Sequence, residues 1–124
     1  MFNGRDGEWR ARIDTIGKGW ASLQLTEQSL PQPVEPDIWL LFAPIKRGRV
    51  DFLVQKATEL GVSILLPTTT RRTVVERINL VRLGTTAAEA AEQCRRLSVP
   101  ELRPVQSLEK VLASWPEERR LLFC

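Results

Sequence analysis

The sequence contains no histidine and no tyrosine, and it has only two cysteines among its 124 residues. Without histidine the chain cannot form a serine–histidine or cysteine–histidine nucleophile pair, because the commonest general base is missing. A zinc site would have to depend on Cys94, Cys124 and carboxylates, and the two cysteines form no spaced motif. We therefore expect no metal site.

Long apolar runs and a leader sequence are also missing. No stretch reaches the roughly eighteen consecutive apolar residues of a membrane-spanning helix, and no basic segment followed by an apolar one opens the chain. We therefore expect a soluble, cytoplasmic protein. The isolated glycines Gly48, Gly61 and Gly84 form no glycine-rich phosphate loop, so the sequence shows no nucleotide-type cofactor motif.

Positive charge is concentrated in the middle of the chain. The net charge is only +3, but between Pro44 and Arg103 eleven lysines and arginines outnumber six acidic residues. Most of the eleven are arginines, whose forked guanidinium groups suit contacts to phosphate. This distribution favours a nucleic acid partner, and a solvated face held by ion pairs is the alternative.

The stretch Arg49–Pro67 predicts a helix that leads into a buried strand. Gly61 ends the helix, and the apolar run Val62–Leu66 is closed by Pro67. A second apolar run, Ile38–Ala43, precedes the helix, so the unit is strand, helix, strand, as in a parallel α/β sheet. The apolar residues of the helix recur at spacings of three and four, as on one helical face: Val50, Leu53, Val54, Ala57 and Leu60.

The first part of the chain has a different pattern. Residues 2–26 alternate in polarity on both sides of a turn at Gly17–Gly19, which predicts a β-ribbon. Two strands alone are marginal in water, so the ribbon resembles the tail of a larger β domain. Ser29–Pro36 holds three prolines and predicts a semi-rigid linker. We expect a β domain at 1–28, a linker at 29–36 and an α/β domain at 37–124.

A polar loop, Thr68–Thr73, follows the second predicted strand and contains Arg71 and Arg72. Ligands of open α/β sheets gather at the carboxyl ends of the strands, where this loop should lie. A second helix is predicted over Leu80–Leu97, with Glu89, Gln93 and Arg96 on one face. An ordinary polar face with a helical ion pair is the alternative interpretation of that group.

The rest of the chain predicts short elements. Val99-Pro100 ends the second helix, Arg103–Gln106 is a weak strand, and Ser107 caps a short helix at Leu108–Ala113. Arg119–Cys124 begins another apolar strand. The tryptophans, including Trp39 and Trp115, are expected in the core rather than as stacking platforms, because no basic and aromatic residues alternate around them.

Five segments, in their order and spacing, resemble the bacterial 16S rRNA uridine N3-methyltransferases of the SPOUT superfamily: Lys46-Arg-Gly-Arg49, Gln55-Lys-Ala-Thr-Glu-Leu-Gly-Val62, Arg72-Thr-Val74, Glu89-Ala-Ala-Glu-Gln-Cys-Arg-Arg96 and Val99-Pro100. The resemblance covers Ile38–Cys124, and the ribbon resembles the later strands of that family's PUA-like RNA-binding barrel. It implies a Rossmann-like parallel sheet that is knotted when complete, a homodimer, and 16S rRNA of the small ribosomal subunit as the partner.

The resemblance also implies S-adenosylmethionine as the cofactor and N3 of a uridine as the methyl acceptor. The family holds this cofactor with a Gly-Pro-Glu-Gly-Gly loop and a Leu-Arg-Thr-Glu-Thr-Ala segment, which would follow Cys124. We therefore expect a fragment that lacks both ends of the enzyme, has no cofactor-binding residues and is inactive by itself. A non-catalytic RNA-binding or ribosome-assembly module is the alternative, and a domain that only dimerises is a third possibility.

Charge and resemblance together predict two groups of site residues. The expected RNA contacts are basic: Lys46, Arg47, Arg49, Arg71, Arg72 and Arg96. The expected polar shell beside the target base is Gln55, Lys56, Glu59, Glu89 and Gln93. Glu59 could instead pair with Lys56, and Arg96 could simply cover the flank of the helix. The sequence identifies no catalytic residue and no group that takes the N3 proton.

Overall fold

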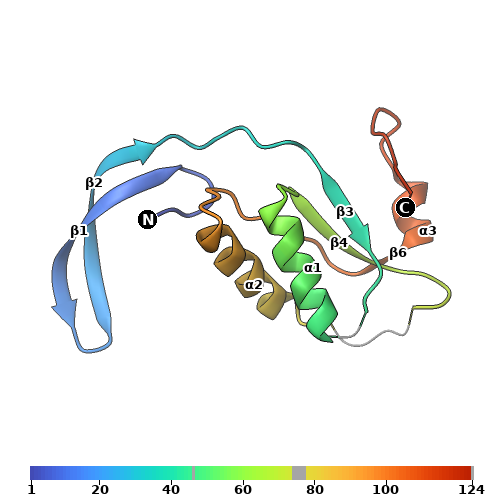
Figure 1. The fold of residues 1–124 in the computed structure, drawn as a ribbon, viewed down its shortest axis with the longest axis horizontal. Helices are drawn as coiled ribbons and strands as arrows, with labels where there is room; N and C mark the ends of the chain where they lie inside the picture. The colour runs from blue at the N-terminus through green and yellow to red at the C-terminus, as the bar shows by residue number, and fades with distance from the viewer. Residues whose placement is uncertain (46, 74–77, 124) are drawn as a thin grey trace.

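The computed structural model describes residues 1–45, 47–73 and 78–123. A long β-hairpin occupies one end of the molecule, and an α/β unit occupies the other (Figure 1). An extended segment, residues 31–38, connects the two.

The hairpin consists of β1 (Glu8–Gly17) and β2 (Trp20–Leu30), paired antiparallel around a two-residue turn. Gly19 has a φ of +82°, a conformation that glycine adopts without steric cost. Apolar side chains of the hairpin are exposed, including Ile16 (72%) and Leu25 (55%), so the ribbon has no core of its own. The predicted ribbon is confirmed, but β2 extends two residues into the predicted linker because Leu30 still pairs with Glu8.

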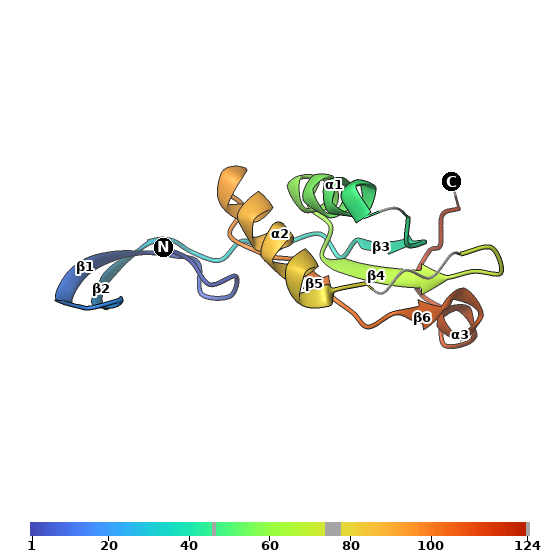
Figure 2. The same ribbon diagram turned by 90° about the horizontal axis from the view of Figure 1, so that it is seen from below.

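A small parallel sheet forms the centre of the α/β unit. Its strands β3 (Trp39–Phe42), β4 (Ile64–Thr69) and β5 (Glu101–Leu102) lie in that order, and β6 (Gln106–Ser107) also pairs with β4. The helices α1 (Arg47–Glu59) and α2 (Leu80–Gln93) lie side by side on one face, and α3 (Leu108–Ala113) lies toward the other (Figure 2). This arrangement confirms the predicted α/β class with a parallel sheet.

The apolar residues of the two long helices pack on the sheet. Val54, Leu65, Leu83 and Ala87 are fully shielded from water, and Leu40, Leu53, Val99 and Leu102 surround them. The predicted stripe of α1 is buried at Val50, Val54 and Ala57, but Leu60 is 81% exposed because the helix ends at Glu59.

Proline occurs inside β4, although the sequence predicted that Pro67 would close the strand. The strand continues to Thr69, with Pro67 paired to Phe42. Proline has no N–H to donate, which usually excludes it from a central strand. Here the ladder on the other side of β4 is interrupted between Leu102 and Gln106, and this interruption lies opposite Pro67.

Two further elements differ from prediction. The second helix ends at Gln93 rather than Leu97, because Arg95 adopts a φ of +59° and leaves the helical conformation. Arg119–Phe123 forms no strand, and Leu122 and Phe123 are almost fully exposed, while Cys124 lies outside the described residues. The short helix capped by Ser107 is confirmed, since the serine side chain accepts a bond from the Lys110 N–H.

Within the described residues, none of the helices has the length and apolar character that crossing a membrane requires.

Candidate nucleic-acid interface

The loop after β4 is a tight turn that presents two arginines. The Thr70 N–H donates to the Thr73 hydroxyl at 2.8 Å, and the Thr73 N–H donates to the Thr70 carbonyl at 3.1 Å. The two hydroxyls lie 2.9 Å apart. These bonds close a four-residue turn with Arg71 and Arg72 at its two central positions, and both residues are exposed. Among the described residues, neither arginine forms an ion pair.

The turn at residues 70–73, which we call the arginine turn, forms one wall of an open cleft of about 540 Å³. The other wall comes from the start of α3, which β6 places beside β4 by pairing Ser107 with Thr69. The lining residues are Thr69, Thr70, Arg71, Arg72, Ser107, Leu108, Glu109 and Leu112. Two guanidinium groups beside an apolar surface provide contacts for a phosphate backbone and for the faces of bases.

Additional positive charge lies at the start of α1, which follows β3 at the same edge of the sheet. Arg47 and Arg49 belong to the first turn, which contains no acidic residue, and Arg49 is exposed. Cations at a helix N-terminus oppose the helix dipole, whereas an anion there is stabilised by it. An approaching phosphate would therefore relieve this unfavourable arrangement. The predicted contact Lys46 and residues 74–77 lie outside the described residues.

The predicted polar shell does not lie at this edge. The helix α1 begins near the carboxyl end of β3 and runs back across the sheet, with α2 beside it (Figure 1). Arg82 in the first turn of α2 pairs with Asp51, the fifth residue of α1. Glu89 and Gln93 are exposed in the second half of α2, and Gln55 is exposed in the second half of α1. Lys56 donates to both carboxylate oxygens of Glu59, at 2.8 and 2.9 Å, so the alternative interpretation of this pair as a helical ion pair is confirmed.

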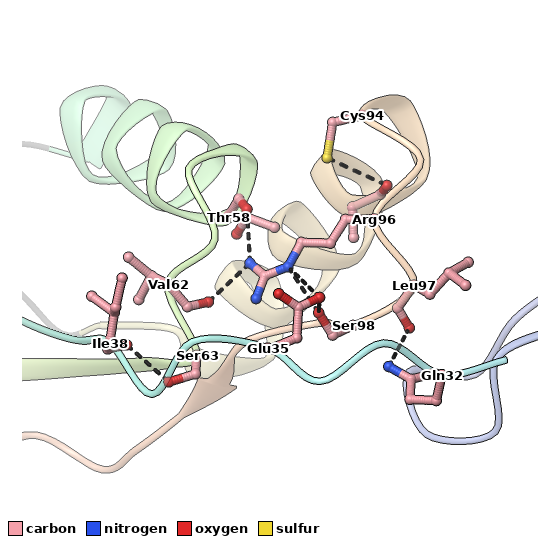
Figure 3. A network of polar contacts seen from close by, with 11 residues as sticks. Gln32, Glu35, Ile38, Thr58, Val62, Ser63, Cys94, Arg96, Leu97 and Ser98 are labelled. Carbon is pink, nitrogen blue, oxygen red and sulfur yellow. Dashed lines mark hydrogen bonds and ion pairs between the residues drawn. The ribbon is translucent and has the colours of Figure 1, made fainter.

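Arg96 has a different environment from the one predicted for an RNA contact. Its side chain is only 9% exposed, and one terminal nitrogen donates to the carbonyls of Thr58 (2.8 Å) and Val62 (2.9 Å) (Figure 3). Its Nε donates to the Ser98 hydroxyl at 2.8 Å and lies 3.4 Å from the Glu35 carboxylate. The prediction that Arg96 shares a helical face with Glu89 and Gln93 is wrong, because the helix ends before it.

Trp39 and Trp115 have aromatic or cationic partners within the molecule. The guanidinium groups of Arg103 and Arg119 lie 4.3 and 4.1 Å from the ring centre of Trp39. Trp115 packs edge-on against the same ring at 5.8 Å. The Trp39 ring is thus covered by intramolecular partners. The expectation that the tryptophans lie in the core is wrong, because Trp39 and Trp115 are only half-buried and Trp20 is 59% exposed.

Sequence reasoning missed the second wall of the cleft and the partners of Arg96. Ser107 was recognised as a cap, but nothing in the sequence indicated that α3 would lie beside the arginine turn. Gln32 and Glu35 are more than sixty residues from Leu97, Arg96 and Ser98 in the sequence, so no local pattern could reveal these contacts. The three short-range threonine bonds of the turn, in contrast, follow from the hydroxyl-rich sequence itself.

The cleft beside Arg71 and Arg72 does not fit a sulfonium cofactor. The cleft presents two guanidinium groups, which would repel the positive sulfur of S-adenosylmethionine, while they attract an anion. Within the described part of the chain, no group of three or more histidine, cysteine, aspartate or glutamate residues could hold a metal ion. The arrangement is therefore better suited to binding a polyanion than to holding either group.

The chain is similar to known RNA methyltransferases. The sequence model of the RNA methyltransferase domain matches residues 32–124. The chain is 33% identical over 112 residues to ribosomal RNA small subunit methyltransferase E of Rickettsia conorii, an alignment that covers 90% of this chain and 46% of that protein.

Two solved structures are similar in fold and in sequence. A methyltransferase from Legionella pneumophila in complex with the cofactor SAM is 26% identical, with a TM-score of 0.81, and the match covers 97% of this chain and 52% of that one. The ribosomal RNA small subunit methyltransferase E from Neisseria gonorrhoeae, bound to S-adenosyl methionine, is 26% identical with a TM-score of 0.77, covering 94% and 51%. The chain thus spans about half the length of these relatives.

Proposed function

Because this chain belongs to the RNA methyltransferase domain family, we propose that the complete protein methylates ribosomal RNA of the small subunit and that these residues supply part of its RNA-binding surface. The finer proposal is transfer of a methyl group from S-adenosylmethionine to N3 of a uridine in 16S rRNA. The names of the relatives support the coarser activity, and the order of motifs in the chain supports the uridine N3 specificity.

The observation that carries the RNA-binding proposal is the exposed arginine turn on the cleft. Arg71 and Arg72 belong to a turn closed by three threonine bonds, so the backbone at both arginines is ordered before RNA binds. We propose that these arginines contact the phosphate backbone, together with Lys46, Arg47 and Arg49. Arg96 is left out of this group because its side chain is only 9% exposed, and its Nε and one terminal nitrogen already donate within the molecule.

We propose that the predicted polar shell forms a second surface that faces the RNA. Gln55, Glu89 and Gln93 are exposed and lie eight, nine and thirteen residues after the first residue of their helices, which corresponds to about 12–20 Å along the helix axis. A folded RNA segment is wide enough to cover both regions. Lys56 and Glu59 neutralise each other, so we expect them to contribute less to RNA binding than the arginine turn.

Methyl transfer to N3 requires loss of the uridine N3 proton and alignment of the base with the methyl donor. S-adenosylmethionine would supply the methyl group. The cleft does not fit that cofactor, so we propose that its site and the base that removes the proton lie elsewhere in the complete protein, and that the 124 residues alone are inactive. We also propose a homodimer and a cytoplasmic location, as in the family that the motifs resemble.

The test reverses both arginines of the turn in the complete protein. Arg71→Glu/Arg72→Glu should weaken binding to small-subunit rRNA at least tenfold and make the slope of log K against log salt shallower by about 1.5, because two phosphate contacts are lost. Fluorescence anisotropy over a salt series measures both quantities.

The matched control is Arg95→Glu/Arg120→Glu, which changes the net charge equally at two exposed positions away from the cleft. The control should lose much less affinity and keep its salt slope nearly unchanged. Equal losses in the two variants would mean that only net charge matters, and the cleft would not be an RNA-binding site.

A further inference from the structure

The segment between the hairpin and the sheet bonds to the α/β unit at four residues: Gln32, Glu35, Asp37 and Ile38. Within residues 31–38, Gln32 and Glu35 are partly buried while Pro33, Val34 and Pro36 are exposed, and Val34 is completely so. The segment contains three prolines, which favour an extended, polyproline-like backbone. We infer that this segment is a clamped strap, held by Arg96, that fixes the hairpin relative to the α/β unit and makes Arg96 a positioning residue.

Arg96 joins three parts of the chain at one point. Its two bonds to Thr58 and Val62 hold the carbonyls at the end of α1 and before β4, and its Nε reaches Ser98 and Glu35 (Figure 3). The Ser98 hydroxyl also donates to the same Glu35 carboxylate oxygen. A buried guanidinium is tolerated only when it is paired and hydrogen-bonded, and Glu35 provides the only negative charge that pairs with it among the described residues.

Two more contacts hold the strap on either side of Glu35. On the hairpin side, the Gln32 side-chain amide donates to the Leu97 carbonyl at 3.4 Å, and its oxygen accepts from the Gly7 N–H at 3.0 Å. On the sheet side, the Ile38 carbonyl accepts from the N–H and the hydroxyl of Ser63, at 2.8 and 2.9 Å. The strap is thus bonded to the α/β unit on both sides of Glu35, although the Ile38 side chain is 48% exposed.

The hairpin itself is attached closely to this strap. Gly7 has a φ of +77°, and a Cβ atom there would lie 2.2 Å from the Leu30 carbonyl and 2.8 Å from the Gln32 nitrogen. Gln32 therefore connects the base of the hairpin to the loop that follows α2, in which Arg96 lies. The orientation of the hairpin is fixed by these contacts rather than by the length of a flexible tether.

A fixed orientation matters if both units touch one RNA, and this step rests on the proposed function. A second contact made by a rigidly attached unit occurs at a high effective concentration, so an RNA that reaches both units binds more tightly than one that reaches the cleft alone. A loose strap would lower this advantage without changing either surface.

The first experiment measures the orientation directly in the complete protein. Spin labels at Lys18→Cys in the hairpin turn and Lys110→Cys in α3, with Cys94 and Cys124 replaced by serine, report the distance between the units by electron–electron double resonance. The parent protein and the control variant Val34→Ala should give a narrow distance distribution. Gln32→Ala/Glu35→Ala should broaden it, and an equally narrow distribution in that variant would overturn the strap.

The second experiment compares a long segment of small-subunit rRNA with a short oligonucleotide that can reach only the cleft. Gln32→Ala/Glu35→Ala should weaken binding of the long RNA about tenfold and leave the short one nearly unchanged. An equal loss for both RNAs would overturn the positioning role.

Failure of the proposed function and failure of the strap give different results. If the parent protein bound neither RNA, the proposed function would fail, while the distance distributions would still decide whether the strap exists. If the double variant did not fold, Glu35→Gln would replace it, because it keeps the side-chain shape and removes only the charge. Arg96→Lys should broaden the distances whereas Arg95→Lys should not, since lysine cannot bridge both sets of acceptors.

Discussion

At the residue scale, Asp37 shows how one exposed carboxylate organises its surroundings. It pairs with the Arg119 guanidinium and accepts the Trp39 indole N–H at 2.7 Å. These contacts, with the Arg119 bond as the largest cause and the Trp39 bond next, hold the pKa of the Asp37 carboxyl below its usual value. Arg119 also covers the Trp39 ring, so the cluster ties the segment after α3 to the start of β3.

The lowered pKa predicts a pH dependence with a definite sign. A carboxyl whose pKa is lower in the folded than in the unfolded protein stabilises the fold above its unfolded pKa, and this contribution disappears as the pH falls below about 4. Asp37→Asn should therefore be less stable than the parent at pH 7, and the difference should shrink toward pH 3. Urea denaturation at the two pH values measures it, with Glu117→Gln as an exposed control. A constant difference would contradict the assignment.

The arginines show what a sequence cannot distinguish. Arg71 and Arg72 follow a strand in a hydroxyl-rich loop, and both their exposure and their position at the sheet edge were predictable from local pattern. Arg96 has the same side chain and a similarly charged neighbour, but it is buried because carbonyls distant in sequence accept its donors. Long-range contacts of this kind leave no periodic signal.

At the scale of elements, the end of α2 depends on one backbone conformation. The apolar pattern continues through Cys94 and Leu97, so periodicity predicts four more helical residues than the structure has. Arg95 instead adopts a φ of +59°, in the left-handed region where glycine is favoured. That turn brings Arg96 back toward the end of α1, and the strap contacts depend on it.

This conformation predicts a stabilising substitution. Arg95 is exposed and makes no hydrogen bond with its side chain among the described residues, so Arg95→Gly should remove the left-handed strain and raise the free energy of unfolding by about 0.5–1 kcal/mol. Glu89→Gly, inside the same helix, should lower it by about 1 kcal/mol. Denaturant unfolding of the complete protein measures both, and destabilisation by Arg95→Gly would show that the side chain has a role that the backbone does not explain.

The buried elements were predictable, and the marginal ones were not. The continuous apolar runs of β3 and β4 indicate strands that are buried on both faces, and the apolar stripe of α1 indicates a helix that is buried on one face. These two patterns together predict the parallel α/β unit. The strand expected at Arg119–Phe123 is not formed, and no described strand pairs with it. An apolar run predicts a strand only when a neighbouring strand supplies the hydrogen bonds, and the sequence of the run does not contain that information.

At the scale of the whole molecule, the chain contains two surfaces of different kinds. The hairpin exposes apolar side chains along both strands, including Ile13 and Leu23, whereas the α/β unit has a buried apolar core and exposes arginines at one sheet edge. The chain spans about half the length of its relatives. The proposed methyl transfer is therefore assigned to the complete protein, and these residues are proposed to contribute to RNA binding.

The activity itself provides the most direct test. The complete protein is incubated with unmodified small ribosomal subunits and S-adenosylmethionine carrying an isotopically labelled methyl group, and the 16S rRNA is then digested to nucleosides for mass spectrometry. We expect labelled 3-methyluridine, reduced at least tenfold by Arg71→Glu/Arg72→Glu and retained by Arg95→Glu/Arg120→Glu. Absence of labelled RNA, or label on a different nucleoside, would contradict it.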